Sequence, residues 1–234
     1  MKHTCLLSMT LMVAGLPATA LPLMTLDQQF DLMEKGANTA LDTRQVSHDG
    51  VIMTAWLDGD LPVIIAVPRL DENGQQQGVS RYYFKQGELF GVREPEARFS
   101  FHDGHLLEWL DEHGKPERFV SKVSMQQRER WLVRRAAELK SLFVPSQAEL
   151  SLDKGGAGAP AAGSARTEWL CNQKMLAMSG AADVTHDGAH WQLDAQQVKG
   201  RVRLSREGQW VELDMVCQVT ANRVTRLTWQ AVHP

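Results

Sequence analysis

The 234-residue sequence contains only three cysteines and no apolar run long enough to cross a bilayer. A membrane-spanning helix needs about 20 consecutive apolar residues, and every apolar stretch of this chain is shorter or is interrupted by charge. The cysteines show no Cys-x-x-Cys spacing, which argues against a zinc ribbon or a thioredoxin-like redox motif. The sequence therefore predicts no integral membrane segment, no metal and no cofactor.

An excess of positive charge is also absent. The chain has 25 basic and 28 acidic side chains, whereas nucleic-acid-binding domains usually carry a basic patch and a high isoelectric point. The nucleophile elbow, the P-loop, the dinucleotide-binding glycine motif and the zinc-protease motif are all missing. We therefore expect no nucleic-acid partner, and no catalytic residue is assigned.

The first twenty residues have the layout of a secretory signal peptide. Lys2 supplies the positive charge, Leu6–Leu16 is an uncharged apolar run, and small residues at positions 18 and 20 suit signal peptidase. Residues 1–20 are predicted to be removed by cleavage after Ala20. The mature chain is expected in the periplasm or outside the cell, where an envelope protein or a cell-wall component is the natural partner.

Cleavage of the signal would remove Cys5 and leave Cys171 and Cys217. In an oxidising compartment, two remaining cysteines predict one disulfide. We expect this bond to join a strand around Cys171 to the strand that carries Cys217.

Residues 151–166 are rich in Gly, Ala and Ser and have the composition of a flexible linker. This segment divides an N-terminal region, 21–150, from a C-terminal region, 167–234. A long surface loop inside one domain is the alternative interpretation. The C-terminal region is predicted to be all β.

Two helices and six strands are predicted before the linker. Thr25 can cap the first helix, and Ser124, with Gln127 in the capping-box position, can cap a second helix that Pro145 ends. Alternating segments separated by Gly-containing turns predict antiparallel hairpins between them. The predicted strands are Val51–Trp56, Val63–Val67, Arg81–Phe84, Leu89–Val92, Phe99–Phe101 and Leu106–Leu110. The predicted fold is α+β, an antiparallel hairpin-rich sheet flanked by two helices and followed by a small disulfide-bonded all-β module.

A turn at Glu207-Gly208 predicts the register of a C-terminal hairpin. It pairs apolar residues on one face, and on the other face it places Arg203 opposite Glu212 and Arg201 opposite Asp214. Cross-strand pairs of opposite charge favour this register.

Trp210 falls on the charged face of that hairpin, opposite the small residue Ser205. Exposed indoles are frequent in recognition surfaces. Trp210, with Arg201 and Arg203, is therefore the candidate recognition site.

His102 and His105 flank an Asp-Gly turn, which makes them cross-strand neighbours about 5 Å apart. Two histidines can share zinc, but a stable site needs three or four ligands. The pair is a weak metal candidate, and a plain hairpin turn is the alternative.

The second helix also carries a group of basic residues that can meet anionic lipid or an acidic partner, although a solvated helix face is the competing interpretation. These residues are Arg128, Arg130, Arg134, Arg135 and Lys140.

The absence of catalytic motifs favours an exported, non-enzymatic bacterial envelope protein that binds a protein, glycan or lipid. A hydrolase of cell-wall or glycan material, with scattered catalytic residues, is one alternative. A helix packed on a curved antiparallel sheet is also similar to the half-barrels of periplasmic lipoprotein carriers. That similarity of architecture implies the other alternative, a carrier with an apolar cavity beneath the N-terminal sheet.

Overall fold

The computed structural model describes residues 24–48, 50–206 and 208–232, and the predicted signal peptide, residues 1–20, lies outside these ranges. The helices are α1 Leu26–Ala40, α2 Lys122–Phe143, α3 Gln147–Asp153 and α4 Ser164–Ser179, with a short 3-10 helix at Gly188–His190. The strands are β1 Asp42–His48, β2 Val51–Asp58, β3 Leu61–Leu70, β4 Gln76–Lys85, β5 Glu88–Arg93, β6 Ala97–His102, β7 His105–Asp111, β8 Asp183–His186, β9 Gln192–Leu193, β10 Gln197–Arg206, β11 Gln209–Thr220 and β12 Arg223–Ala231. Within the described ranges, no helix combines the length and the apolarity needed to cross a membrane.

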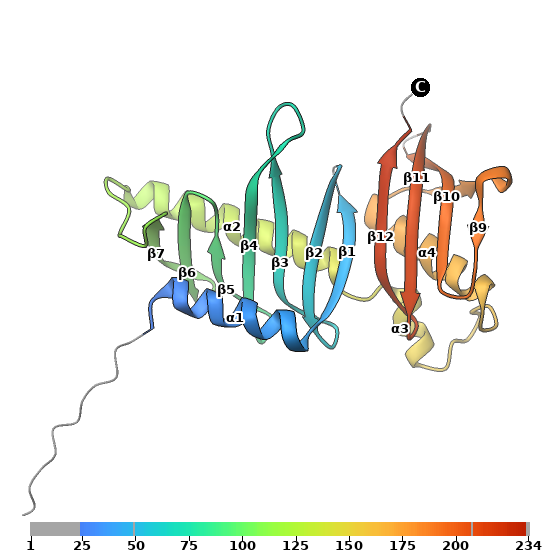
Figure 1. The fold of residues 1–234 in the computed structure, drawn as a ribbon, viewed down its shortest axis with the longest axis horizontal. Helices are drawn as coiled ribbons and strands as arrows, with labels where there is room; N and C mark the ends of the chain where they lie inside the picture. Colours follow the sequence, from blue (N-terminus) through green and yellow to red (C-terminus); the bar gives the residue numbers. More distant parts are fainter. Residues whose placement is uncertain (1–23, 49, 207, 233–234) are drawn as a thin grey trace, which may run out of the picture.

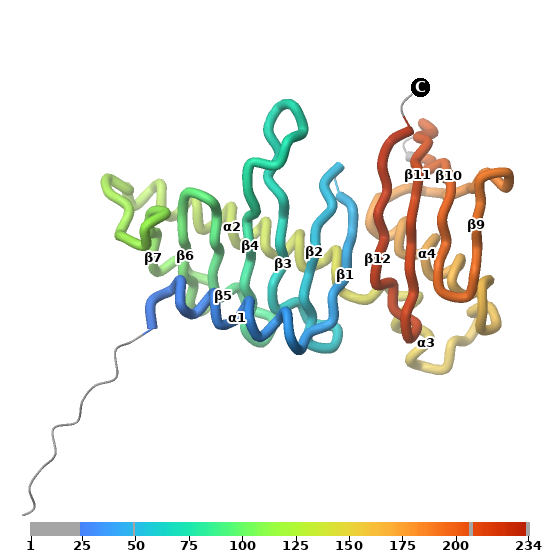
Figure 2. Tube along the Cα trace, in the orientation of Figure 1, coloured from blue at the N-terminus to red at the C-terminus, as the bar shows by residue number. Residues whose placement is uncertain are grey.

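The strands form one sheet in the order β7-β6-β5-β4-β3-β2-β1-β12-β11-β10-β8, with β9 also paired to β10 (Figure 1). An N-terminal half, from α1 to α2, meets a C-terminal half, from α3 to β12, where β1 pairs with β12. This pair is parallel, with Gln45 opposite Arg226 and Val46 opposite Leu227. Figure 2 shows β12 running beside β1 although the two are far apart in the sequence. The sheet is therefore mostly, but not entirely, antiparallel.

All six predicted N-terminal strands are confirmed, and β1 is an additional strand that its polar sequence concealed. The first helix is confirmed with a complete capping box between Thr25 and Gln28. The prediction that Ser124 caps the second helix is wrong. Ser121 is the N-cap, because its backbone is extended and its Oγ accepts the N–H of Ser124. Pro145 follows the end of α2, as predicted.

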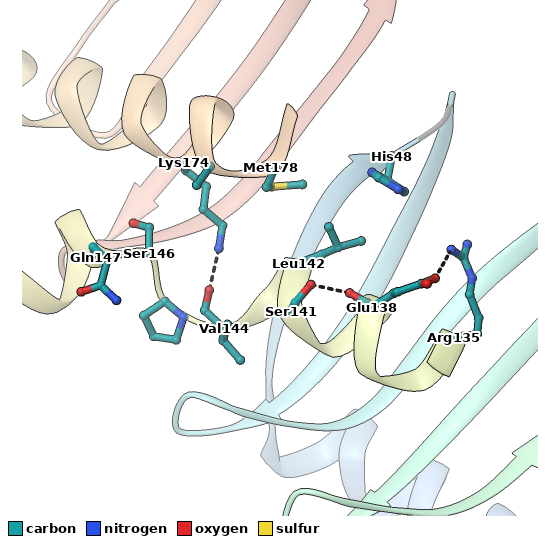
Figure 3. Close-up of a pocket in the computed structure, with 12 residues that line it drawn as sticks. His48, Arg135, Glu138, Ser141, Leu142, Val144, Ser146, Gln147, Lys174 and Met178 are labelled. Carbon is teal, nitrogen blue, oxygen red and sulfur yellow. Dashed lines mark hydrogen bonds and ion pairs between the residues drawn. The ribbon is translucent and has the colours of Figure 1, made fainter. Parts of the chain in front are cut away.

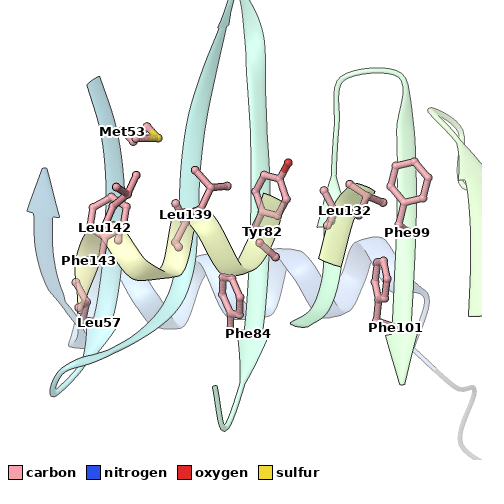
Figure 4. Packing of buried hydrophobic residues seen from close by; sticks show 14 of the residues in the cluster. Met53, Leu57, Tyr82, Phe84, Phe99, Phe101, Leu132, Leu139, Leu142 and Phe143 are labelled. Atoms are coloured by element: carbon pink, nitrogen blue, oxygen red, sulfur yellow. The ribbon is translucent and has the colours of Figure 1, made fainter. Parts of the chain in front are cut away.

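The two N-terminal helices cover opposite faces of the sheet. Tyr82 and Phe84 point to one face and pack with Leu132 and Leu139 of α2 (Figure 4). Tyr83, between them in β4, points to the other face, where its ring stacks on Phe30 of α1 at a centroid distance of 4.0 Å. Alternation along one strand thus builds a three-layer structure with packed side chains on both faces of the sheet.

The prediction of an all-β C-terminal module is wrong, because α4 packs against β10, β11 and β12. Its apolar residues include Leu170, Cys171 and Met175, which all point into the core between helix and sheet. Gly180 ends the helix in the left-handed conformation that favours glycine. Cys171 therefore lies on a helix and not on a strand.

The predicted disulfide between Cys171 and Cys217 is present and joins α4 to β11. Its Cα atoms are 6.0 Å apart, and the two residues are separated by 46 positions in the sequence. Both cysteines are fully buried. The bond therefore fixes the helix to the middle of the C-terminal sheet.

The segment 151–166, predicted as a linker, overlaps α3 at one end and α4 at the other, so that only residues 154–163 lie outside both helices. Ser146 caps α3 with a capping box that includes Glu149. The helical turn at the start of this segment places charged side chains of α3 beside the N-terminal half.

Charged side chains connect the two halves at one end of β1 and β12. Arg223 of β12 donates to Asp60 at 3.0 Å and to Asp153 of α3 at 2.7 Å. Arg44 of β1 donates to the same Asp60 at 2.7 Å and to the carbonyl oxygen of Phe143 at 3.0 Å. We call these side chains, Arg44, Asp60, Asp153 and Arg223, the junction network. It adds contacts to a parallel ladder that is itself short.

Replacing Arg223 with glutamine is expected to flatten the acid dependence of stability. Hydrogen bonds from Arg223 hold the pKa of Asp60 and that of Asp153 below the ordinary value of 3.8. A carboxyl group with a lowered folded-state pKa contributes stability that is complete above its ordinary pKa and is lost as pH falls through the folded-state pKa. The wild-type protein should therefore lose stability more steeply than the variant below about pH 4.

Urea unfolding midpoints measured between about pH 5 and about pH 2 test this expectation. Arg69→Gln is the matched control, because Arg69 pairs with Glu96 in an exposed position outside the junction network. If the urea midpoint falls equally steeply with decreasing pH in the wild type and in Arg223→Gln, the assigned role of the junction network is contradicted.

Candidate functional site

The face of β10, β11 and β12 that α4 does not cover carries all three predicted recognition residues. Their register is as predicted, with Arg203 opposite Glu212 and Arg201 opposite Asp214. Trp210 lies opposite Ser205 on the same face. Figure 1 shows α4 on the far side of these strands, with no helix over the near side. We call this surface the β10–β12 face.

The ion pairs on the β10–β12 face are exposed. Arg203 Nη2 lies 2.6 Å from Glu212 Oε1, and their side chains are 62% and 38% exposed. Arg201 Nε lies 3.4 Å from Asp214 Oδ1. Exposed pairs of this kind typically contribute about 0–1 kcal/mol to stability. These side chains can therefore exchange partners with a ligand at little cost to the fold.

Trp210 is 54% exposed, which is unusual for the largest apolar side chain. Its neighbour Ser205 is too small to cover the indole ring. An indole in this position offers an apolar surface and one N–H donor to a partner. The same hairpin thus presents an aromatic ring and two guanidinium groups in one direction.

A shallow depression of about 490 Å³ lies on the β10–β12 face. Its floor is formed by polar and charged residues of the three strands, namely Lys199, Arg201, Asp214, Arg226, Thr228 and Gln230. Ile52 of β2 borders it on one side, and His190 and Gln192 border it on the other. Both halves of the protein therefore contribute to this depression.

His102 and His105 are direct cross-strand partners, as the turn predicted. Their side chains are 74% and 77% exposed, and the nearest carboxylates are Asp103, at 3.5 Å from His102, and Glu129, at 3.6 Å from His105. Among the described residues, no group of three or more His, Cys, Asp or Glu side chains is placed to hold a metal ion. The donor set around the two histidines does not fit a zinc site.

A second pocket, of about 470 Å³, lies between α2 and α4, where the two halves meet (Figure 3). Lys174 is 4% exposed, and its Nζ donates to the carbonyl oxygen of Val144 at 2.6 Å. Burial lowers the pKa of Lys174. Glu138 pairs with Arg135 at 3.5 Å, and Ser141 Oγ donates to the Glu138 carbonyl oxygen at 2.6 Å. The Lys174 contact joins α4 to the C-cap of α2, the other two contacts lie within α2, and none of the three is a nucleophile–base pair.

Lys174 and Glu149 were not found from the sequence, although both lie in the interior. Glu149 is fully buried, and its carboxylate accepts the N–H groups of Ser146 at 2.6 Å and Val224 at 2.8 Å. Lys174 Nζ lies 3.9 Å from it. The one available signal was the position of Lys174 within the apolar stripe of α4. A charged residue in such a stripe indicates a buried partner.

A depression of about 300 Å³ lies between α2 and the N-terminal sheet, lined by residues that include Phe84, Leu89 and Val133. Within the described residues, side chains of α2 fill one face and side chains of α1 fill the other. The fully buried rings of Tyr83 and Phe99 occupy the space beneath the helices.

No family model, curated protein or solved structure matches this chain. The interpretation of the β10–β12 face therefore depends on its own geometry and charge.

Proposed function

We propose that this protein is exported and binds another component of the cell envelope, without catalysis, through the β10–β12 face. The observation that carries the proposal is that exposed Trp210 and Arg203 and half-buried Arg201 lie together on a sheet face that no described helix covers. The disulfide between Cys171 and Cys217 supports a compartment in which thiols are oxidised. The signal peptide predicted at residues 1–20 supports the same location.

The composition of the face favours a polar partner over an apolar one. Four cations, Lys199, Arg201, Arg203 and Arg226, accompany two carboxylates, Glu212 and Asp214, across neighbouring strands. The guanidinium groups can bind carboxylate or phosphate in two-pronged geometry, and the Trp210 indole can stack on a sugar ring or a peptide side chain. An acidic protein segment or an anionic wall polymer combines these features.

The test is site-specific photocrosslinking in the cell of origin. Trp210→p-benzoylphenylalanine places a photoreactive aromatic group on the β10–β12 face, and Leu32→p-benzoylphenylalanine places the same group on α1, where Leu32 is 61% exposed. We expect a discrete adduct from position 210 and none from position 32. Adding Arg203→Ala should lower the adduct yield by roughly tenfold, because the partner loses a hydrogen bond to a charged group.

Fractionation of the same cells tests the location, with a mature N-terminus at Leu21 as the expected result. Equal adducts from positions 210 and 32, or an unchanged yield with Arg203→Ala, would remove the β10–β12 face as the binding site. Turnover of peptidoglycan fragments by the purified protein would instead favour the hydrolase alternative.

A further inference from the structure

Phe119, in the loop between β7 and α2, is the most exposed apolar residue that the structure describes. Its relative exposure is 101%, so that its ring has no covering neighbour. Its backbone has φ 63°, in the left-handed region that bulky side chains seldom adopt. The chain therefore holds an aromatic ring in water at a conformational cost, a combination typical of functional surfaces.

Exposed cations flank Phe119 in the sequence and continue along α2 as far as Arg134. Over residues 115–134, five basic residues are exposed and Glu117 is the one exposed acid. Arg128 and Glu129 in the same range point inward, where they contact Glu94 and the N–H of Leu106. The five exposed basic residues are Lys115, Arg118, Lys122, Arg130 and Arg134.

The exposed apolar surface continues from the loop onto α2. Val123 is 61% exposed, and the period of an α-helix places it on the same outward side as Arg130 and Arg134. Ser121 caps the helix beside Phe119 and so fixes the point at which the loop becomes helix. We call Phe119, Val123 and the five exposed basic residues the basic aromatic patch.

The described chain begins at the same end of the molecule. The Asp27 carboxylate of α1 lies beside Gly114, in the turn that leads to the patch, and Figure 2 shows the start of α1 near this loop. The start of α1 and the loop that carries Phe119 therefore lie at one end of the molecule.

We propose that the basic aromatic patch docks on an anionic membrane surface. A ring without a pocket partner can enter the interface between headgroups and acyl chains, while the surrounding cations contact lipid phosphates. The fully exposed ring of Phe119 enters no groove formed by the described residues, whereas a bilayer needs none. Since α2 and the β10–β12 face lie on opposite sides of the sheet, this docking leaves the β10–β12 face open to its partner.

The test is cosedimentation of the purified mature protein with vesicles of stated composition. We expect binding to phosphatidylglycerol vesicles, weak binding to phosphatidylcholine vesicles, and loss of binding at high salt because the phosphate contacts are screened. Phe119→Asn should weaken vesicle binding by about tenfold or more, because the variant loses the free energy gained by burying one aromatic side chain. Asparagine tolerates the left-handed backbone, so the loop is preserved.

Leu32→Ala is the matched control, because Leu32 is an exposed apolar residue on the other face of the sheet. It should leave vesicle binding unchanged, and Phe119→Trp should retain binding. Equal binding to both kinds of vesicle, or salt-sensitive binding that Phe119→Asn does not weaken, would overturn the proposal. A different result would also overturn the lipid assignment: the wild-type protein self-associates without binding vesicles, and Phe119→Asn abolishes that self-association. The patch would then bind a second copy of the chain.

Discussion

Replacing both Cys171 and Cys217 with alanine is expected to lower the free energy of unfolding by roughly 4 kcal/mol. The disulfide closes a loop with a sequence separation of 46, and restricting an unfolded loop of that size accounts for a value near this magnitude. Both sulfur atoms are buried between α4 and β11, so their removal also leaves space in the core. Total stabilities of roughly 5–15 kcal/mol make this a large loss.

Guanidinium unfolding with and without dithiothreitol measures this effect. Reduction should lower the midpoint of the wild-type protein toward that of Cys171→Ala/Cys217→Ala and should leave the double variant unchanged, which makes the variant its own control for the reductant. A wild-type midpoint that does not respond to complete reduction, verified by thiol counting, would contradict the expected contribution.

The disulfide also bears on the proposed binding surface. Cys217 lies in β11, the strand that supplies Trp210, Glu212 and Asp214 to the opposite face. Fixing this strand to α4 holds the exposed face in a single arrangement, and pre-organised surfaces lose less entropy on binding.

The N-terminal fold was predictable from the sequence because its signals are local. Asp-Gly and related turns separate alternating strands, and Thr25 and Gln28 form a capping box within one helical turn. The C-terminal hairpin was predictable for the same reason, since Arg203 and Glu212 are brought together by one short turn. The residues of the β10–β12 face that occur in this hairpin could therefore be placed together in advance.

The remaining structure depends on partners that are distant in the sequence. β1 contains buried Arg44 and Ser47, whose hydrogen-bond partners include the Phe143 carbonyl oxygen and the N–H of Trp229. No local pattern identifies such residues as part of a buried strand. Lys174 similarly interrupts the apolar stripe of α4, and only the carbonyl oxygen of Val144 and the Glu149 carboxylate explain its burial.

Replacing Glu149 with glutamine is expected to lower the free energy of unfolding by about 3 kcal/mol, although the two side chains have nearly the same shape. Glu149 is fully buried, and its oxygens accept two backbone N–H groups, from Ser146 and Val224. A glutamine amide must turn its NH₂ group toward one of these donors, which leaves a buried donor without an acceptor. It also removes the negative charge 3.9 Å from Lys174, and breaking a buried ion pair typically costs about 3–5 kcal/mol.

The pH dependence of Glu149→Gln separates the charge effect from the hydrogen-bond effect. Burial lowers the pKa of Lys174, and Glu149 opposes that shift, so the variant should lower this pKa further. A lysine whose folded-state pKa is depressed costs stability below that pKa, and the cost is relieved as pH rises toward the ordinary value of 10.5. The deficit of Glu149→Gln relative to the wild type should therefore shrink as pH approaches about 10.

Glu138→Gln provides the control, because Glu138 is 55% exposed and pairs along α2 with Arg135, so its effect should stay below about 1 kcal/mol. Adding Lys174→Met to Glu149→Gln should recover the part of the loss that comes from the uncompensated charge. A deficit that is constant with pH and unchanged by Lys174→Met would mean that Glu149 stabilises the junction of the two halves through its backbone hydrogen bonds alone. In that case the Val144 carbonyl oxygen holds the buried Lys174, and the contact between α3 and β12 does not depend on Lys174.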